Sequence, residues 1–154
     1  MVRTTGQRGA GANGDAPPEV TYSLERFSET RAAYATNVPA LRWALVAFAK
    51  AQGGSPMALR DIGLAVGEAL NNVVIHAYRD DLEPGSMTVE AHRELTHLAV
   101  AVTDGGRGFE PRADSPGLGL GMPVIAALAA NLSVAAADTS DHPGTIVLMG
   151  FSLN

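Results

Sequence analysis

Three side chains capable of chemistry recur four residues apart in the stretch DIGLAVGEALNNVVIHAY: Glu68, Asn72 and His76. Residues four apart share one face of an α-helix, so a carboxylate, an amide and an imidazole line up along it. A carboxylate can accept a proton, and an amide oxygen can coordinate a hard cation. Apolar Leu64 and Ile75 flank this row, which favours a partly buried pocket. A solvated row on an ordinary amphipathic helix is the alternative.

Two glycine clusters follow and could bring bare backbone close to a ligand. The first is Asp104-Gly105-Gly106-Arg107-Gly108-Phe109 at the end of a predicted strand, and the second is Gly117-Leu118-Gly119-Leu120-Gly121 at the start of a predicted helix. Glycine has no Cβ and tolerates positive φ, so N–H groups can reach phosphate oxygens, and a helix N-terminus favours anions. Each cluster taken alone could equally be a tight turn.

Neither cluster fits two familiar nucleotide motifs. The P-loop requires Gly-Lys-Ser/Thr, and the only lysine in the chain, Lys50, follows no glycine-rich loop. The dinucleotide fingerprint requires Gly-x-Gly-x-x-Gly directly after a strand. Here Pro116 precedes the second cluster, and Met122 occupies the position of the last glycine. A nucleotide site in this chain would therefore belong to another class.

The composition indicates a single soluble domain. The 154 residues carry a formal net charge of −5 and no cysteine, and no apolar run approaches the roughly 20 residues of a membrane span. We expect a cytoplasmic protein that does not bind nucleic acid directly or enter a membrane. Residues 1–19, rich in Gly, Ala and Pro, are expected to be a disordered leader, and residues 20–154 one domain. His92, His97 and His142 lack the spacing of a zinc site.

The elements that must position these groups follow from the apolar periodicity. Helices are predicted from Thr36 or Asn37 to about Gln52, from Asp61 to Tyr78, and from Met122 to Leu132. Strands are predicted over Val20–Phe27, near Arg31–Tyr34, through Met87, Val89 and Ala91, and over Leu98–Thr103, Leu132–Ala137 and Thr145–Leu153. The order predicts an α+β fold: a two-layer sandwich with helices on one face of a mixed, mostly antiparallel sheet.

Four motifs stand in one order along the chain: Glu68-x-x-x-Asn72 on a helix, Asp104-x-Gly106-x-Gly108 after a strand, Gly117-x-Gly119 before a helix, and Gly144-Thr145 before the last strand. This ordered set resembles the GHKL ATPase family, which has the Bergerat fold. The segments AVGEALNNVVIHAY and GLGLGMPVIAALA are similar to those of short bacterial anti-sigma factors with serine-protein kinase activity, of the RsbW and SpoIIAB type. The resemblance covers roughly Val20–Leu153.

The resemblance implies ATP and Mg²⁺ as ligands and assigns matching residues to the nucleoside. Asp104 would accept a hydrogen bond from the adenine amino group, and Thr145 would close the adenine end of the site. Gly106 and Gly108 would let the backbone pass under the base and the sugar.

The phosphate end of the implied site uses the other motifs. Asn72 would give a side-chain oxygen to Mg²⁺, and Glu68 would be the general base for the attacking hydroxyl. Four residues at the head of a helix would meet the phosphates: Gly117, Leu118, Gly119 and Leu120. His76 is expected to have a structural role.

The segment between the two glycine clusters is short. Phe109–Pro116 is shorter than the lid of many relatives and contains Arg112 but no lysine. Arg107 and Arg112 are therefore the cations expected near the phosphates, and solvated loop charge is the alternative for both.

The function implied by the resemblance is that of an anti-sigma factor with ATP-dependent serine/threonine protein kinase activity. Such a protein holds a sigma factor inactive and phosphorylates a small anti-anti-sigma protein of the STAS type, and a homodimer is expected. The alternative is a non-catalytic module that regulates a sigma factor or another partner by binding alone. The catalytic domain of a sensor kinase fits less well, because the chain leaves no room for a phospho-acceptor helix pair.

Overall fold

The fold is a five-stranded sheet covered on one face by helices. The computed structural model describes residues 26–108, 121–138 and 142–154. The strands are β1 (Arg26–Ala32), β2 (Ser86–Glu94), β3 (His97–Asp104), β4 (Asn131–Asp138) and β5 (Pro143–Ser152). Their spatial order is β1-β2-β3-β5-β4, and each of the four pairings is antiparallel. The α+β sandwich is confirmed, but the expectation of a mixed sheet is wrong for the described strands.

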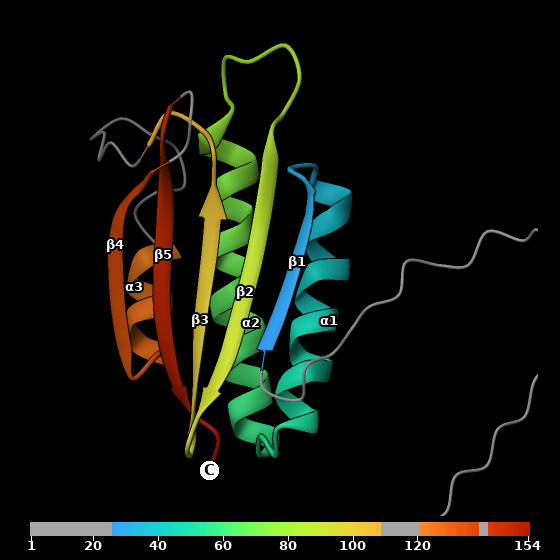
Figure 1. Cartoon of the computed structure of the whole chain (residues 1–154), viewed down its shortest axis with the longest axis vertical. Coiled ribbons are helices and arrows are strands. Elements are labelled where there is room, and N and C mark those ends of the chain that lie inside the picture. The colour runs from blue at the N-terminus through green and yellow to red at the C-terminus, as the bar shows by residue number, and fades with distance from the viewer. Residues whose placement is uncertain (1–25, 109–120, 139–141) are drawn as a thin grey trace, which may run out of the picture.

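The helices all lie behind the sheet in Figure 1 and leave its other face bare in the described residues. They are a 3₁₀-helix (Ala35–Asn37), α1 (Val38–Ala51), α2 (Pro56–Asn72), a π-helix (Val73–Ala77) and α3 (Gly121–Leu128). α2 packs an apolar stripe against the sheet through the buried residues Ile62, Val66 and Ala69, and the stripe continues through Val73 and Ala77 in the π-helix. None of the described helices is long and apolar enough to span a membrane.

The helix predicted over Asp61–Tyr78 is present, but it starts earlier, at Pro56, and its α-helical part ends at Asn72. Ser55 caps α2 through its hydroxyl, which accepts a hydrogen bond from the Ala58 N–H at 3.2 Å. From Val73 the hydrogen-bonding pattern widens to that of a π-helix. The four-residue spacing therefore keeps Glu68 and Asn72 on one face but no longer extends that straight row to His76.

Three further predictions about where elements begin or end require correction. β1 runs without a break over Arg26–Ala32, so the expected end at Phe27 and the separate piece near Arg31–Tyr34 are wrong; residues 20–25 lie outside the described part. Asn37 precedes α1, but its side-chain amide donates to the Ala32 carbonyl at 2.9 Å and does not cap the helix. α3 ends at Leu128 rather than Leu132, because Leu132 already pairs with Met149 in the sheet.

The core lies between the helices and the inner face of the sheet. The side chains that face it from β2 and β3 alternate along both strands and are buried: Met87, Val89, Ala91, Leu98, Val100 and Val102. β3 is the central strand of the sheet. This arrangement places the buried end of β3, at Asp104, beside the last turns of α2.

Candidate functional site

The buried carboxylate of Asp104 lies at the end of β3, on the helix side of the sheet. Only 6% of the residue is exposed. Its Oδ1 accepts hydrogen bonds from the backbone N–H groups of Gly106 at 2.9 Å and Thr145 at 3.3 Å. Burial raises the pKa of this carboxyl, and the two N–H donors oppose that rise. Oδ2 accepts no hydrogen bond from the described residues, so one oxygen is held by the protein and the other is left for a donor.

The first glycine cluster is packed directly against other backbone. A Cβ on Gly106 would collide with the carbonyl of Ala77, and a Cβ on Gly144 would collide with the carbonyl of Asp104. Gly108 has φ +87° and approaches the carbonyl of Pro143. These contacts give the glycines a structural reason of their own, independent of any ligand. Their predicted place under the base and sugar stays a prediction.

Tyr78, which follows the π-helix, holds the first glycine cluster in place through hydrogen bonds. Its hydroxyl accepts a hydrogen bond from the Gly105 N–H at 2.8 Å and donates one to the Ser86 carbonyl at 2.6 Å. The Arg107 N–H donates to the Ala77 carbonyl at 3.2 Å. Burial raises the pKa of Tyr78, which keeps its hydroxyl protonated and able to donate. Sequence reasoning missed this residue, because a tyrosine at a helix end carries no recognisable motif.

Glu68 and Asn72 meet the first residue of α3. Both side chains are partly buried, and a Cβ on Gly121 would lie 3.2 Å from both terminal atoms of the Asn72 amide and 3.5 Å from Glu68 Oε2. Asn72 Nδ2 is buried and has no hydrogen-bond partner among the described residues. Amide nitrogen and oxygen are assigned from their surroundings, so an amide turned over would place its oxygen in that position. An unpartnered amide beside a carboxylate suits an ion that prefers oxygen ligands, and the residues therefore fit Mg²⁺.

The remaining predicted residues divide into two groups. Arg107 pairs with Asp80 at 2.8 Å and lies 3.8 Å from Asp81, which is consistent with a solvated loop charge; its expected place near the phosphates stays a prediction. The other predicted residues lie outside the described part of the chain: Arg112 and, from the second glycine cluster, Gly117, Leu118, Gly119 and Leu120.

His76 is partly buried and lies in the π-helix that follows Asn72. Burial and the nearby Arg79 lower its pKa, so the ring is neutral at neutral pH. This environment contains no feature that assigns His76 a chemical role, and its structural assignment stays a prediction.

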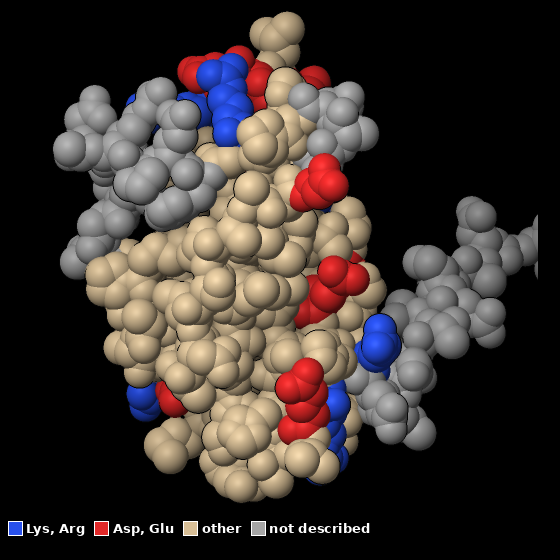
Figure 2. Space-filling model, turned by 60° about the vertical axis from the view of Figure 1, so that its left-hand side comes forward, with Lys and Arg blue, Asp and Glu red and all other residues tan. Residues whose placement is uncertain are grey.

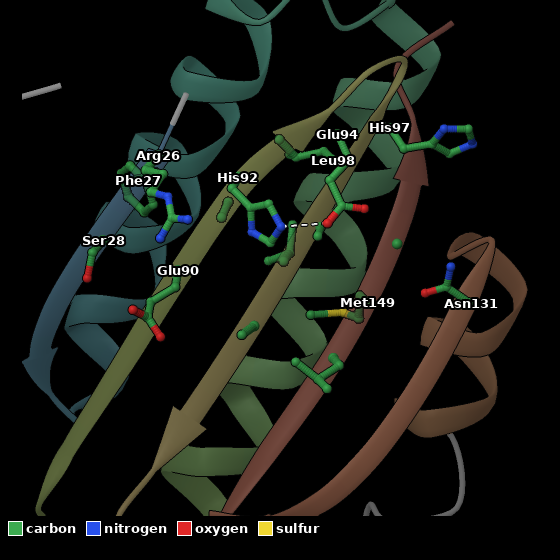
Figure 3. Close-up of a pocket in the computed structure, with 16 residues that line it drawn as sticks. Arg26, Phe27, Ser28, Glu90, His92, Glu94, His97, Leu98, Asn131 and Met149 are labelled. Atoms are coloured by element: carbon green, nitrogen blue, oxygen red, sulfur yellow. Dashed lines mark hydrogen bonds and ion pairs between the residues drawn. The ribbon is translucent and has the colours of Figure 1, made fainter. Parts of the chain in front are cut away.

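A separate hollow of about 520 Å³ lies on the bare face of the sheet. Figure 3 shows its charged rim, where the His92 ring contacts Glu94 at 2.7 Å and Arg26 and Glu90 project from β1 and β2. Side chains alternate across a sheet, so this hollow and Asp104 are on opposite faces. It is not part of the site formed by Asp104, Asn72 and Glu68.

Comparison with known proteins gives the site its context. The profile of the histidine kinase-like ATPase domain matches residues 31–151, which include Glu68, Asn72, Asp104 and Thr145. The chain belongs to the histidine kinase-like ATPase domain family.

The chain is also similar to part of a curated protein and shares its fold with part of a solved structure. Over an aligned stretch of 69 residues, the chain is 39% identical to the serine-protein kinase RsbW of Listeria innocua. That stretch covers 45% of this chain and 43% of that protein. The fold is shared with the RsbU and RsbW domains of Rv1364c from Mycobacterium tuberculosis, with a TM-score of 0.62 and 20% identity. That match covers 83% of this chain and 32% of the other. The chain thus spans less than half the length of either protein.

Proposed function

We propose that this domain is an ATP-dependent protein-serine/threonine kinase that also acts as an anti-sigma factor. It would hold a sigma factor inactive and phosphorylate a small anti-anti-sigma protein of the STAS type. The family membership and the partial similarity to the serine-protein kinase RsbW support this proposal. The observation that carries it is the placement of two chemically different ends on one scaffold: a half-free carboxylate at Asp104, and the Glu68 and Asn72 pair below α3.

The proposed site uses the protein groups in distinct roles. Asp104 Oδ2 accepts a hydrogen bond from the adenine amino group, while Oδ1 remains bound to Gly106 and Thr145. The Asn72 amide oxygen is a ligand for Mg²⁺, which supplies positive charge to the phosphates when bound. Gly121 lacks the side chain that would fill the space beside Asn72.

Glu68 acts on the attacking hydroxyl in this proposal. The serine or threonine oxygen forms a bond to the γ-phosphorus, the bond from that phosphorus to the β-bridging oxygen breaks, and ADP leaves. The hydroxyl proton passes to the Glu68 carboxylate. Most of the acceleration in such a reaction comes from positioning and charge stabilisation, so Glu68 supplies only part of it.

Phosphoryl transfer tests this proposal directly. The whole chain would be incubated with labelled ATP, Mg²⁺ and a purified STAS-type protein of the same organism, and phosphoserine would be quantified. We expect transfer by the wild type and a loss of about 100-fold or more in Glu68→Gln, with ATP binding retained. Glu90→Gln is the matched control, because Glu90 is an exposed carboxylate on the bare face of the sheet. Equal transfer by Glu68→Gln and wild type would contradict the catalytic role.

The anti-sigma half is tested separately by measuring complex formation between the purified chain and a sigma factor of the same organism. We expect a complex that Glu68→Gln forms as well as the wild type. Absence of binding to every sigma factor of the organism would overturn this half alone.

A further inference from the structure

Two aliphatic side chains beside Glu68 and Asn72 are exposed to solvent. Leu64 is 47% exposed and Ile75 is 52% exposed. Leu64 lies one helical turn before Glu68, and Ile75 lies three residues after Asn72. Because the side chains of a helix lean toward its N-terminus, the Glu68 carboxylate extends to the side of Leu64. Branched aliphatic side chains therefore border the candidate site at the protein surface.

The π-helix presents Ile75 to solvent. Val73 and Ala77, at the two ends of this segment, are buried in the core, whereas Ile75 between them is exposed. π-Helical turns are rare and occur frequently at functional sites. This segment starts directly after Asn72, so it places an exposed aliphatic side chain next to the proposed ligand of Mg²⁺.

α3 borders the site from another side and carries no charged residue. Its first residue, Gly121, meets Asn72 and Glu68, and Val124 follows one turn later with 40% exposure. The other exposed residues of α3 are proline and alanine. Residues 121–154 contain no lysine or arginine, and Figure 2, which brings α3 and β4 forward, shows a broad area without charged side chains. An extended apolar surface of this kind is typical of a protein interface.

We propose that Leu64, Ile75 and Val124 form a docking rim for the phospho-acceptor protein. The inference rests on the kinase activity proposed above. The acceptor hydroxyl must come within hydrogen-bond distance of the Glu68 carboxylate, so the acceptor surface around that hydroxyl has to lie against the side chains that surround Glu68. Aliphatic side chains at this place bind an aliphatic surface of the partner and exclude water from the reacting groups. The partner that fits is a protein whose acceptor serine or threonine is set among aliphatic side chains.

The length of the rim indicates a protein acceptor rather than a small one. Ile75 lies 11 residues after Leu64 along the helix, which corresponds to about 15 Å at a rise of about 1.5 Å per residue. A free amino acid or a sugar is too short to contact both side chains at once. The surface of a folded protein can contact both and still place one hydroxyl between them at Glu68.

Other exposed leucines lie too far from Glu68 to serve this acceptor. Leu148, 41% exposed, lies in the hollow on the bare face, and the sheet separates it from the helices. Leu95, 88% exposed, lies in the turn between β2 and β3, at the opposite end of β3 from Asp104. A protein bound at either leucine would leave its hydroxyl on the wrong side or at the wrong end of the sheet.

Steady-state kinetics of the whole chain test this inference, with a STAS-type protein of the same organism as acceptor and labelled ATP and Mg²⁺. Glutamine is introduced at the rim because it is polar, suits a helix and leaves the charge around Glu68 unchanged. We expect Leu64→Gln and Ile75→Gln each to raise the KM for the acceptor about tenfold and to leave kcat unchanged, because they remove binding that is equal in the ground state and the transition state. Leu148→Gln is the matched control and should change neither constant.

Two further measurements make the test specific to docking. Leu64→Met keeps an apolar side chain of similar volume, so it should keep the KM for the acceptor within about twofold of the wild type. Calorimetric titration with ATP should give the same affinity for the wild type, Leu64→Gln and Ile75→Gln, which also verifies that the variants fold.

The outcomes separate this inference from the proposed function. Absence of transfer by the wild type would overturn the kinase activity and the docking rim together. Transfer by the wild type with a KM for the acceptor that is unchanged in Leu64→Gln and Ile75→Gln, or raised equally by Leu148→Gln, would overturn the docking rim alone. A loss of kcat or of ATP affinity in the rim variants without a rise in that KM would also overturn it, since the residues would then act on the chemical step or on the nucleotide.

Discussion

The two ends of the candidate site, which we propose bind the adenine end and the phosphate end of ATP, are built differently. At the adenine end, Asp104 Oδ1 is held by two backbone N–H groups, and Tyr78 fastens the adjoining glycine cluster. At the phosphate end, the Asn72 amide is buried with one atom unpartnered among the described residues. A buried polar atom without a partner costs free energy, so the phosphate end gains most from a ligand. In the proposed site, the Asp104 end is therefore preformed, while the Asn72 end would be completed by a ligand.

The largest effect on stability is expected from a side chain added at Gly106, where the structure leaves no room for one. Gly106→Ala drives a Cβ into the Ala77 carbonyl and should lower the free energy of unfolding by about 3 kcal/mol. Gly105→Ala is the control, because its Cβ would be 3.6 Å from the Tyr78 hydroxyl, an ordinary contact, and it should change the stability by less than about 0.5 kcal/mol. Urea unfolding measures both. Equal stabilities would show that the glycine cluster is loosely held.

A smaller effect is expected from the tyrosine that joins the cluster to the helix end. Tyr78→Phe leaves the Gly105 N–H and the Ser86 carbonyl without their partner and should cost about 1 to 2 kcal/mol. Tyr34→Phe removes an exposed hydroxyl bonded to Glu83 at 3.2 Å and should cost less than about 0.5 kcal/mol. Thermal unfolding of both variants measures the difference. If the two variants lose the same stability, Tyr78 does not fasten the cluster.

The smallest effect has the opposite sign and depends on pH. Burial raises the Asp104 pKa above its ordinary value of 3.8, so the folded state holds the proton more tightly than the unfolded state does. Stability is therefore lost as the pH rises from 3.8 through the folded-state pKa. Asp104→Asn removes this penalty and keeps the acceptor at Oδ1, so it should stabilise the fold at pH 7 by on the order of 1 kcal/mol.

Urea unfolding at pH 4 and pH 7 checks the sign of this effect. The advantage of Asp104→Asn over the wild type should shrink toward pH 4, where the wild-type carboxyl approaches protonation. An advantage that grows toward low pH would contradict the assignment of burial as the dominant influence on Asp104.

The spacing of apolar residues predicted the fold well, because the apolar residues that recur at helix or strand spacing are the ones that are buried. The apolar residues at helical or strand spacing in α1, α2, β2 and β3 form buried faces, and the predicted order of the described elements is correct. The errors concern the ends of elements, where one residue can fit the pattern of either adjacent element. Leu132, for example, continues the apolar spacing of α3 but pairs in β4. The π-helix after Asn72 could not be predicted, since it changes the hydrogen-bonding pattern without a change in composition.

The contacts that hold the candidate site together could not be predicted from the sequence. Asn72 and Asp104 are the last residues of α2 and β3, while the roles predicted for Glu68, Asn72, Asp104 and Thr145 stay predictions. The support from Tyr78 and Ala77 depends on contacts between segments far apart in the sequence, and no local pattern records such contacts. The same holds for Arg107, whose partners Asp80 and Asp81 lie on another loop.

The central claim is that Asp104 recognises the adenine amino group, and the most direct measurement is a calorimetric titration with ATP and with inosine triphosphate. The inosine base has a carbonyl oxygen in place of that amino group. The wild type should bind ATP about tenfold more tightly, because Asp104 Oδ2 accepts only from a donor.

Asp104→Asn provides the decisive arm of the same titration. Gly106 and Thr145 keep the amide oxygen in the Oδ1 position, so the amide nitrogen faces the base and the preference should reverse toward inosine triphosphate. Equal affinities of the wild type for the two nucleotides, together with an unchanged ratio in Asp104→Asn, would contradict the account.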